Sequence, residues 1–578
     1  MKAIDFRALI KNQWVLVLSL VVLVSFFTTV FDLFSGRFGG VSSQRRVDAS
    51  GKRIWVLDAS GSRGSDGKDF SEIINSVAEG DTIELKPGVY NGPAVVARSI
   101  RLVGQTANSG ERASIHYTAG LGMTVTAAQI NVENIEFTQT SAGQSGIIVV
   151  SGQTIAEISK CAFLTRGSYC ISGQGSARIV AQDSKFLSFN QGAGFFIKGN
   201  VNGTLERCDF EENQEGAHSE GTSYLTLNDC TFQKNTPTKA GSCVFVSSGG
   251  NAQVNGCHFS DNENAAPVQV GQSDMTLNNC IFERNSGSEV GFAIQAQNGA
   301  TLHISNSTFT EDKRPVLIKD GSRLFMENCK LDKCGESSKS VSGANLLIED
   351  KNSQATIKKA AFSDIQYAGV LVADEAQLTM QDSTINGGQY GIDLGTTKEK
   401  GLVGGTANLQ NVTITGQVGQ MVRLTRGSKL TMVNCKLNTA DAYYSAIYLD
   451  SGANIDMSGC EVQGGKKHGL EAVGANTLVV AKNCKFLSFQ DAGVLARRNA
   501  RATLDSCTLE QNDIGAEVGD GTDAHDNATL TLQNCTVSSN RTFGVSAVQR
   551  SVLVLSAITY NDQITQIHKD PSAAVRDH

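Results

Sequence analysis

One short pattern recurs along most of this chain and constrains its fold more than any other feature. It is an Asn-Cys pair with a large apolar residue two positions after the cysteine, as in Asn279-Cys280-Ile281-Phe282. The cysteine position can be followed through 18 copies from Ile135 to Ile558, at a mean spacing of about 25 residues. Such a spacing is typical of a solenoid rather than of several globular domains.

Each period contains three short segments in which apolar and polar residues alternate. Tyr390-Gly391-Ile392-Asp393-Leu394 and Ala300-Thr301-Leu302-His303-Ile304 are examples of two of them, and the Asn-Cys segment is the third. Alternation over a few residues indicates β-strands, and no helical segment occurs within the period. The sequence therefore predicts an all-β fold, a right-handed parallel β-helix of about 18 coils and roughly 85 Å in length.

Composition agrees with this fold and excludes one class of partner. The chain has 59 Gly and 6 Pro, as expected for many tight turns and uninterrupted strand pairing. Its net charge of -7 is small for 578 residues, so we expect no nucleic acid partner.

The 14 cysteines are predicted to be packing residues. Eleven of them occupy the repeat position, where Ser, Ala, Val and Ile also occur. Stacked in-register side chains keep their Cβ atoms about 4.8 Å apart, too far for a disulfide. No Cys-x-x-Cys pair is present, so no metal site is predicted. Cys170, Cys243 and Cys334 lie off this row.

Residues 14–31 contain no charge and are predicted to form a transmembrane signal anchor after a polar tail, residues 1–13. A cleaved signal peptide is the alternative. A short tail favours a single-pass inner or plasma membrane protein with its solenoid outside the cytoplasm, in the periplasm. Three basic residues on each side barely decide the orientation, and free cysteines argue for the opposite one.

The remaining boundaries follow from composition. Residues 32–53 form a predicted linker, 54–122 an N-terminal cap and first coil, 123–560 the β-helix and 561–578 a polar tail. Within the cap, Asp69 and Glu72 form a capping box before an apolar stripe that ends at Gly80. We expect this helix to cover the open end of the solenoid.

Gly80-Asp81-Thr82-Ile83-Glu84-Leu85-Lys86-Pro87-Gly88-Val89-Tyr90 and Ile100-Arg101-Leu102-Val103-Gly104 resemble the N-terminal coil of the pectin-lyase-like superfamily. The resemblance covers roughly residues 54–560 and is carried by the residues that build coils. It implies the β-helix fold and a carbohydrate-binding or sugar-hydrolase relative. The catalytic patterns of pectinesterases and polygalacturonases are absent; Lys467-His468-Gly469 echoes one of them, without a paired Asp one coil earlier.

Four segments are predicted to be inserted loops: Glu211–Thr222, Asp332–Gly343, Thr396–Thr406 and Gly519–Asn527. The last contains Asp523-Ala524-His525-Asp526, which resembles the Asp-Pro-His-Asp motif of alginate epimerases. Asp523, His525 and Asp526 are therefore catalytic candidates, with a solvated turn as the alternative. The acidic segment Glu211–Glu220 is a candidate Ca²⁺ loop or a solvated face, and no other cofactor is expected.

Strand alternation predicts a row of outward side chains that successive coils stack into one stripe. Acidic, Arg and Tyr side chains in such a row can grip sugar hydroxyls and carboxylates; an ordinary solvent face is the alternative. The predicted ligand-binding residues are Asp393, Arg423, Tyr448, Asp450, Glu471, Arg497 and Glu517.

Three functions remain open at this point. The first is a membrane-anchored β-helix that binds an acidic polysaccharide without strong catalysis. The second is an envelope scaffold whose partners are proteins. The third is a polyuronate epimerase or lyase.

Overall fold

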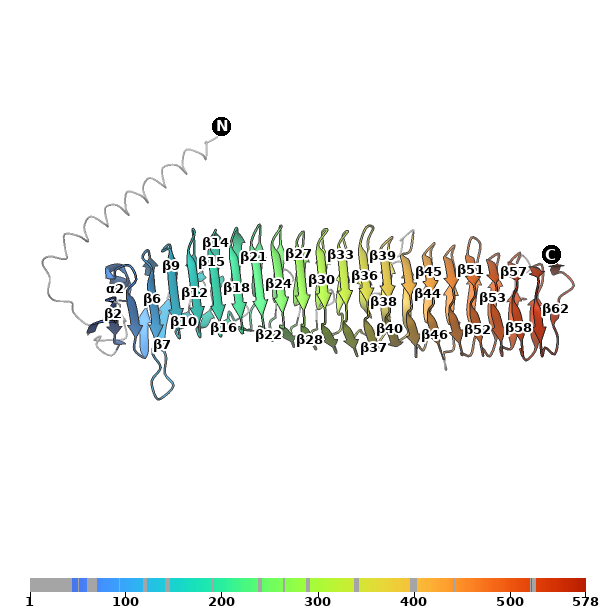
Figure 1. Ribbon diagram of the computed structural model, residues 1–578, viewed down its shortest axis with the longest axis horizontal. Helices are drawn as coiled ribbons and strands as arrows, with labels where there is room; N and C mark the ends of the chain where they lie inside the picture. Colours follow the sequence, from blue (N-terminus) through green and yellow to red (C-terminus); the bar gives the residue numbers. More distant parts are fainter. Residues whose placement is uncertain are drawn as a thin grey trace, which may run out of the picture.

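The computed structural model describes residues 44–577, apart from residues 50, 60–69, 93, 118–121, 141–145, 190–191, 237–241, 264–265, 287–291, 337–342, 396–402, 440–441, 520 and 522–525. These residues form one long, narrow rod (Figure 1). The strands β2 (Arg53–Leu57) and β62 (Ile567–Lys569) lie at its opposite ends. The predicted all-β solenoid is confirmed.

Three sheets run along the rod, and each coil contributes one strand to each sheet. In the coil around Cys280 these are β26 (Val268–Gly271) in sheet C, β27 (Asp274–Asn278) in sheet A and β28 (Ile281–Glu283) in sheet B. Each pairs in parallel with the equivalent strands one coil earlier and later. Among the described residues sheets B and C hold 20 strands each.

The expected number of about 18 coils was therefore too low by two. The additional coils are the first two, which place β4 (Gly88–Asn91) and β7 (Ala113–Tyr117) in sheet B. A longer connection leads into β7 from β6 (Ile100–Gly104), and neither of the two coils has the Asn-Cys corner. The repeat on which the count rested is thus absent from them.

The Asn-Cys pair forms the corner between sheets A and B. Asn279 has a φ of 55°, in the left-handed region that Asn tolerates better than most residues. The next residue, Cys280, points inward, and its thiol donates to the carbonyls of Asn278 and, one coil earlier, Val254, both at 3.5 Å. All 14 cysteines are free and buried, which confirms that they are packing residues.

The inner face of sheet B holds a continuous column of phenylalanine rings. Neighbouring rings lie nearly parallel, with centroids 4.7 to 5.2 Å apart. The column consists of Phe137, Phe163, Phe186, Phe210, Phe232, Phe259, Phe282 and Phe309. Each ring is buried, so one apolar residue per coil fixes the register of the next.

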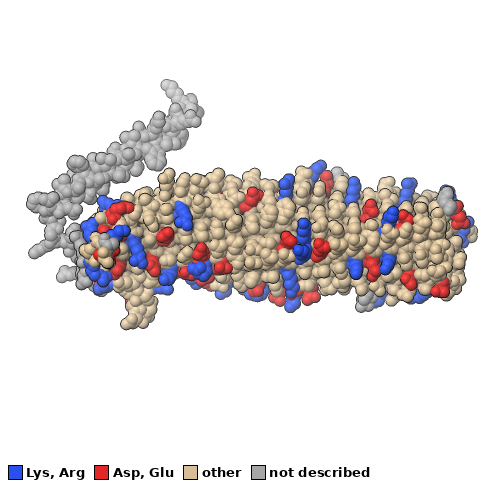
Figure 2. All heavy atoms as spheres, in the orientation of Figure 1, with Lys and Arg blue, Asp and Glu red and all other residues tan. Residues whose placement is uncertain are grey.

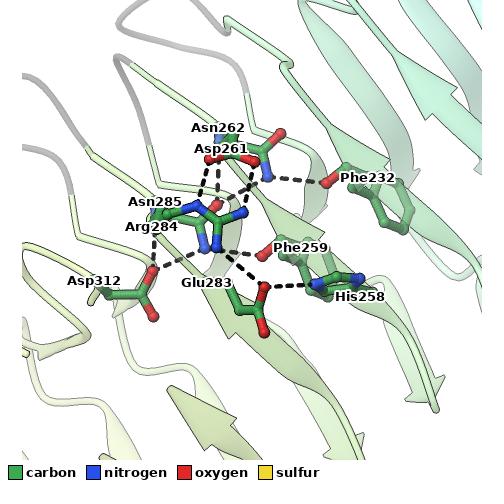
Figure 3. A network of polar contacts seen from close by, with 9 residues as sticks. All are labelled: Phe232, His258, Phe259, Asp261, Asn262, Glu283, Arg284, Asn285 and Asp312. Carbon is green, nitrogen blue, oxygen red and sulfur yellow. Dashed lines mark hydrogen bonds and ion pairs between the residues drawn. The ribbon is translucent and has the colours of Figure 1, made fainter. Parts of the chain in front are cut away.

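In the coils from Phe210 to Phe309, a ladder of buried side-chain amides that ends in Asp312 lies three residues after each phenylalanine, and Figure 3 shows its last three members. Asn262 donates from Nδ2 to Asn285 Oδ1 at 2.9 Å and to the Phe232 carbonyl at 3.0 Å. Asn285 repeats this with Asp312 Oδ1 at 2.9 Å and the Phe259 carbonyl at 3.0 Å. These bonds satisfy backbone groups where the chain leaves sheet B.

The N-terminal region differs from the prediction. Part of the expected linker forms β1 (Gln44–Val47), which pairs antiparallel with β2. Helix α2 (Phe70–Ser76) contacts β4 and β5 (Ala94–Val96), and its Phe70 and Ile74 are buried in the core. No described helix is long and apolar enough to cross a membrane. Residues 14–31 and Asp69 lie outside the described residues.

Two other expectations were wrong. The segment predicted as a polar tail, 561–578, is not loose in its described part, because after β61 (Thr559–Asn561) the strands β62 and β63 (Ala574–Asp577) extend sheets C and A. The segment Glu211–Thr222 is not an inserted loop, because β20 (Glu215–Glu220) is a regular strand of sheet C. Small residues at its inward positions had hidden this strand.

Candidate functional site

The outer face of sheet C carries the predicted ligand-binding row. Residues aligned from coil to coil run Asp393, Arg423, Tyr448, Glu471, Leu495, Glu517. They lie on β41 (Tyr390–Gly395), β44 (Val422–Leu424), β47 (Ile447–Leu449), β50 (Leu470–Val473), β53 (Ala492–Arg497) and β56 (Ile514–Val518). The expected register is confirmed, and the role of these residues in binding stays a prediction.

The first two members of this row are bound to each other. Arg423 Nε donates to Asp393 Oδ1 at 2.8 Å, and Arg423 Nη2 makes a second, short bond to Oδ2. The guanidinium also lies 4.2 Å from the ring centroid of Tyr390 and donates to its hydroxyl at 3.2 Å. The Asp393 side chain is only 2% exposed, so it is not the solvent-facing group that alternation suggested.

Asp393 is buried because the preceding coils build an apolar cluster on the outside of sheet C. Its row neighbours there are Leu317, Leu347 and Leu371. Tyr367 and Tyr390 pack edge to face in the same cluster, with ring centroids 5.5 Å apart. The Asp393–Arg423 pair therefore closes an apolar surface and is part of the structure.

Further along the row, Glu471 is held between two coils. Arg497 donates to its Oε1 from Nε at 3.0 Å and from Nη2 at 2.7 Å, and Ser445 Oγ donates to Oε2 at 2.5 Å. Burial alone would raise the pKa of Glu471, but the hydrogen bonds from Ser445 and Arg497 and the charge of Arg497 lower it below its usual value. Glu471 is thus an ionised, oriented acceptor.

A cleft of about 630 Å³ opens above Glu471 and Arg497. Its lining includes Tyr448, Glu517 and Lys467, together with side chains that the sequence did not single out: Tyr443, Tyr444, Asp491 and Arg498. Tyr448 donates from its hydroxyl to Asp450 Oδ2 at 3.3 Å. Five of the seven predicted residues thus lie in or beside one cleft, while Asp393 and Arg423 lie outside its lining.

Two adjacent tyrosines stand at this cleft. Tyr443 is 70% exposed and Tyr444 is 54% exposed. These are the two largest exposed fractions among the described Phe, Tyr and Trp side chains. The Nζ of Lys466 lies 4.0 Å from the ring centroid of Tyr443. Lys467 and Arg498 are exposed as well, so three cationic side chains lie near the aromatic pair.

His468 lies in the wall of the cleft and is neutral. The backbone N–H of Ala492 donates to its Nδ1 at 3.3 Å, which leaves the ring proton on Nε2. Nε2 faces the Asp491 carboxylate at 3.7 Å. Burial lowers the pKa of His468, against the opposing effect of Asp491. The carboxylate that His468 faces thus belongs to Asp491, one coil later, and the paired Asp one coil earlier is absent, as the sequence indicated.

The predicted catalytic trio stays a prediction, because the structure describes only one of its three members. Asp523 and His525 lie outside the described residues. Asp526 is fully buried, and its Oδ1 accepts the backbone N–H groups of Asn499 at 3.1 Å and Ala528 at 2.8 Å. In another coil the equivalent turn is fixed by a buried threonine, because Thr477 Oγ1 accepts the backbone N–H of Gly452 at 3.2 Å. Asp526 has the same role for the turn at Asn499.

The acidic segment proposed for Ca²⁺ is built into strands. Glu211 pairs with Lys185 at 2.8 Å, and Glu220 pairs with Lys198 at 3.2 Å. Within the described residues, no group of three or more His, Cys, Asp or Glu side chains is arranged to hold a metal ion. On the face shown in Figure 2, Lys and Arg are interspersed with Asp and Glu, and most of the surface is uncharged.

Comparison with known proteins agrees with this architecture. The family described as "Right handed beta helix region" matches residues 98–243, 169–316, 304–404 and 401–560. The chain belongs to this family. This assigns the right hand to the solenoid. Among curated proteins the sequence has no significant match.

Three of the solved structures that match the chain are the following. A PL6 alginate lyase in complex with a trisaccharide is 10% identical, with 70% of this chain and 85% of that chain covered and a TM-score of 0.30. The catalytic unit of a thermostable GH87 alpha-1,3-glucanase from Streptomyces thermodiastaticus strain HF3-3 is 14% identical, with coverages of 66% and 67% and a TM-score of 0.34. An alginate lyase from Paenibacillus sp. str. FPU-7 is 10% identical, with coverages of 53% and 94% and a TM-score of 0.29. Likenesses this distant carry no information about what this chain binds.

Proposed function

We propose that this β-helix binds an anionic polysaccharide in the cleft on sheet C. The observation that carries the proposal is the exposed pair Tyr443 and Tyr444 beside a floor of oriented polar groups. Aromatic faces next to fixed hydrogen-bonding groups suit sugar rings, which have apolar faces and polar edges.

The charges favour an acidic chain over a neutral one. On the floor, Glu471 is neutralised by Arg497. At the rim, Lys467 and Arg498 are exposed, and Lys467 lies 3.6 Å from Asp491, a distance typical of a weak surface pair. A carboxylate or sulfate on the polymer can therefore approach Lys467 without first breaking a strong ion pair.

The test compares the full chain with a double Tyr443→Ala, Tyr444→Ala variant in calorimetric titrations against soluble anionic and neutral polysaccharides. We expect the variant to bind the anionic polymers roughly tenfold more weakly, which is the contribution of about 1.4 kcal/mol from two stacked rings. Tyr224→Ala is the matched control, because Tyr224 is 37% exposed but lies on sheet A. Binding to no polysaccharide, or equal loss in the control, would refute the proposal.

Anchoring through residues 14–31, with the solenoid outside the cytoplasm, is part of the same proposal and rests on the sequence. Burial of every cysteine removes the main objection to an oxidising compartment. Helix α2 is proposed to cover the N-terminal end of the core. Extraction of the full chain from membranes by detergent, but not by alkaline buffer, would support the anchor; release by alkaline buffer would refute it.

An envelope scaffold and a polyuronate epimerase or lyase remain the alternatives. Cross-linking that captures one stoichiometric protein partner in place of a glycan would favour the scaffold. Formation of unsaturated or epimerised products from polyuronates, lost in His468→Ala or in His525→Ala, would favour the enzyme, because His468 is the histidine among the described residues that line the cleft and His525 belongs to the predicted catalytic trio.

A further inference from the structure

Asp312 occupies a rung of the amide ladder in which the four preceding coils have asparagine (Figure 3). Each of those asparagines donates from Nδ2 to the carbonyl of a phenylalanine one coil earlier, at 3.0 to 3.1 Å. They are Asn213, Asn235, Asn262 and Asn285. The ladder ends at Asp312, because Cys334 occupies the equivalent place in the next coil.

The ladder geometry determines what the two carboxyl oxygens of Asp312 face. Oδ1 accepts from Asn285, from its backbone N–H at 2.8 Å and its Nδ2 at 2.9 Å. Phe309, three residues before Asp312, is aligned with Phe282 of the preceding coil. An asparagine at position 312 would therefore donate from Nδ2 to the Phe282 carbonyl, and Asp312 has Oδ2 in place of that donor. Asp312 is fully buried, and its Oδ2 has no hydrogen-bond partner in the described structure. If Asp312 were ionised, its Oδ2 and the carbonyl oxygen of Phe282 would both be acceptors and neither would have a proton to share.

We propose that Asp312 is a neutral carboxylic acid in the folded protein, that its proton completes the ladder as an amide would, and that loss of this proton weakens the solenoid at this coil. The carbonyl of Asp312 also accepts the backbone N–H of Gly335 at 3.0 Å, which ties the rung to the start of the following connection. Asp312 thus acts as a pH-sensitive joint in the middle of the rod.

The charges of the preceding coil do not supply a free cation to Asp312. Arg284 is bound by Asp261 at 2.8 and 2.9 Å and contacts Glu283 at 3.3 Å. Glu283 in turn lies 3.5 Å from His258. Burial raises the pKa of Asp312 to about 7, and Glu283 adds to this, while the hydrogen bonds from the ladder and the charge of Arg284 oppose it.

The following coil presents Asp332 and Cys334. Asp332 is hydrogen-bonded by Ser363. Burial raises the pKa of the Cys334 thiol, so it remains protonated and offers no charge to Asp312. Neither group stabilises an ionised Asp312.

The sign of the pH effect follows from proton binding. The pKa of Asp312 in the folded chain is about 7 and that of an unfolded aspartate about 3.9. Between these values the folded state holds a proton that the unfolded state lacks, so stability falls as pH rises. The unfolding equilibrium constant should increase about tenfold per pH unit from pH 5 to 7 and level off above pH 7.

The experiment is urea unfolding of the full chain and of Asp312→Asn between pH 5 and 9. We expect the ratio of their unfolding constants to rise about tenfold per unit up to pH 7, with the variant more stable at pH 8. Asp183→Asn is the control, because Asp183 is a surface residue at a corner where other coils have Asn, and its ratio should not vary over this range. Parallel profiles, or a less stable Asp312→Asn at pH 8, would overturn the proposal.

A second measurement is independent of how the variant folds. The infrared spectrum of the folded wild-type chain at pH 5.5 should contain a protonated carboxyl band that disappears by pH 8.5. Absence of that band at pH 5.5 contradicts the proposal.

Discussion

The guanidinium of Arg497 lies 2.7 Å from the carboxylate of Glu471, across one coil of the outer face of sheet C. Both side chains are largely buried, at 22% and 12% exposure. The pair forms the floor of the cleft, so its first effect is on stability.

Glu471→Gln is expected to lower the free energy of unfolding by about 2 kcal/mol, because charged hydrogen bonds from Arg497 and Ser445 are lost. The pKa of Glu471 is lowered in the fold, so its contribution is present above the unfolded pKa and is lost as pH falls through the folded value. Urea unfolding at pH 7 and pH 3 checks both points. Glu461→Gln serves as control, since Glu461 is 39% exposed and only 3.6 Å from Lys485; an equal loss there would contradict the expectation.

Arg423→Ala should destabilise the chain by about 3–5 kcal/mol, because it leaves the Asp393 carboxylate buried without a partner. The double variant Asp393→Leu, Arg423→Leu should recover most of this loss. The chain itself places Leu347 and Leu371 in the same row, so leucine fits the surface there. The denaturant midpoints of the wild-type chain, Arg423→Ala and the double variant measure these stabilities. A double variant less stable than Arg423→Ala would contradict the expectation that leucines can replace the ion pair.

The native protein should not react with a thiol reagent at pH 8, whereas the urea-unfolded chain should take up 14 labels. Burial raises the pKa of Cys280 and Cys329 to about 11 and denies the reagent access. Mass spectrometry after timed labelling measures this. Rapid labelling of the folded protein would contradict the burial of the cysteine row.

Phe282→Ala should cost about 3–5 kcal/mol of unfolding free energy, because the ring is fully buried between Phe259 and Phe309 with both centroids at 4.7 Å. Phe325→Ala removes a ring that is 42% exposed on sheet A and should cost far less. Thermal or chemical unfolding of both variants provides the comparison. Equal losses would mean that the column does not set stability.

The coil could be predicted because its corner is short and chemically specific. Asn279 has a left-handed backbone conformation, which favours Asn, and Cys280 occupies the adjoining inward position, which favours a small buried residue. Both preferences are visible in the sequence as the repeated Asn-Cys pair. The outward row could be predicted for the same reason, since alternation in a strand of fixed register places Tyr448 beside Glu471.

Other features of the structure could not be predicted from the sequence. The second coil has a longer connection before sheet B, between β6 and β7, and in the last coil Ile564 and Ile567 are exposed at the end of the rod. Tyr443 and Tyr444 lie within the connection between β46 (Lys436–Asn438) and β47, so their position in the same cleft as Arg497 depends on how that connection folds. The burial of Asp393 depends on the preceding coils and is invisible in its own strand.

The constant two-residue corner between sheets A and B has a consequence for how this rod can change in length. From Asn134 onward this corner keeps two residues, while length varies in connections from sheet B to sheet C, such as 311–315 and 333–343, and from sheet C to sheet A, such as 396–405. If a stretch of sequence that begins and ends at this corner is duplicated or lost, the rod therefore gains or loses one complete coil. That coil carries all three strands and, within the phenylalanine column, one ring. Genes for such rods can shift the distance between the cleft and the N-terminal end in steps of about 4.8 Å while each surviving coil keeps its neighbours.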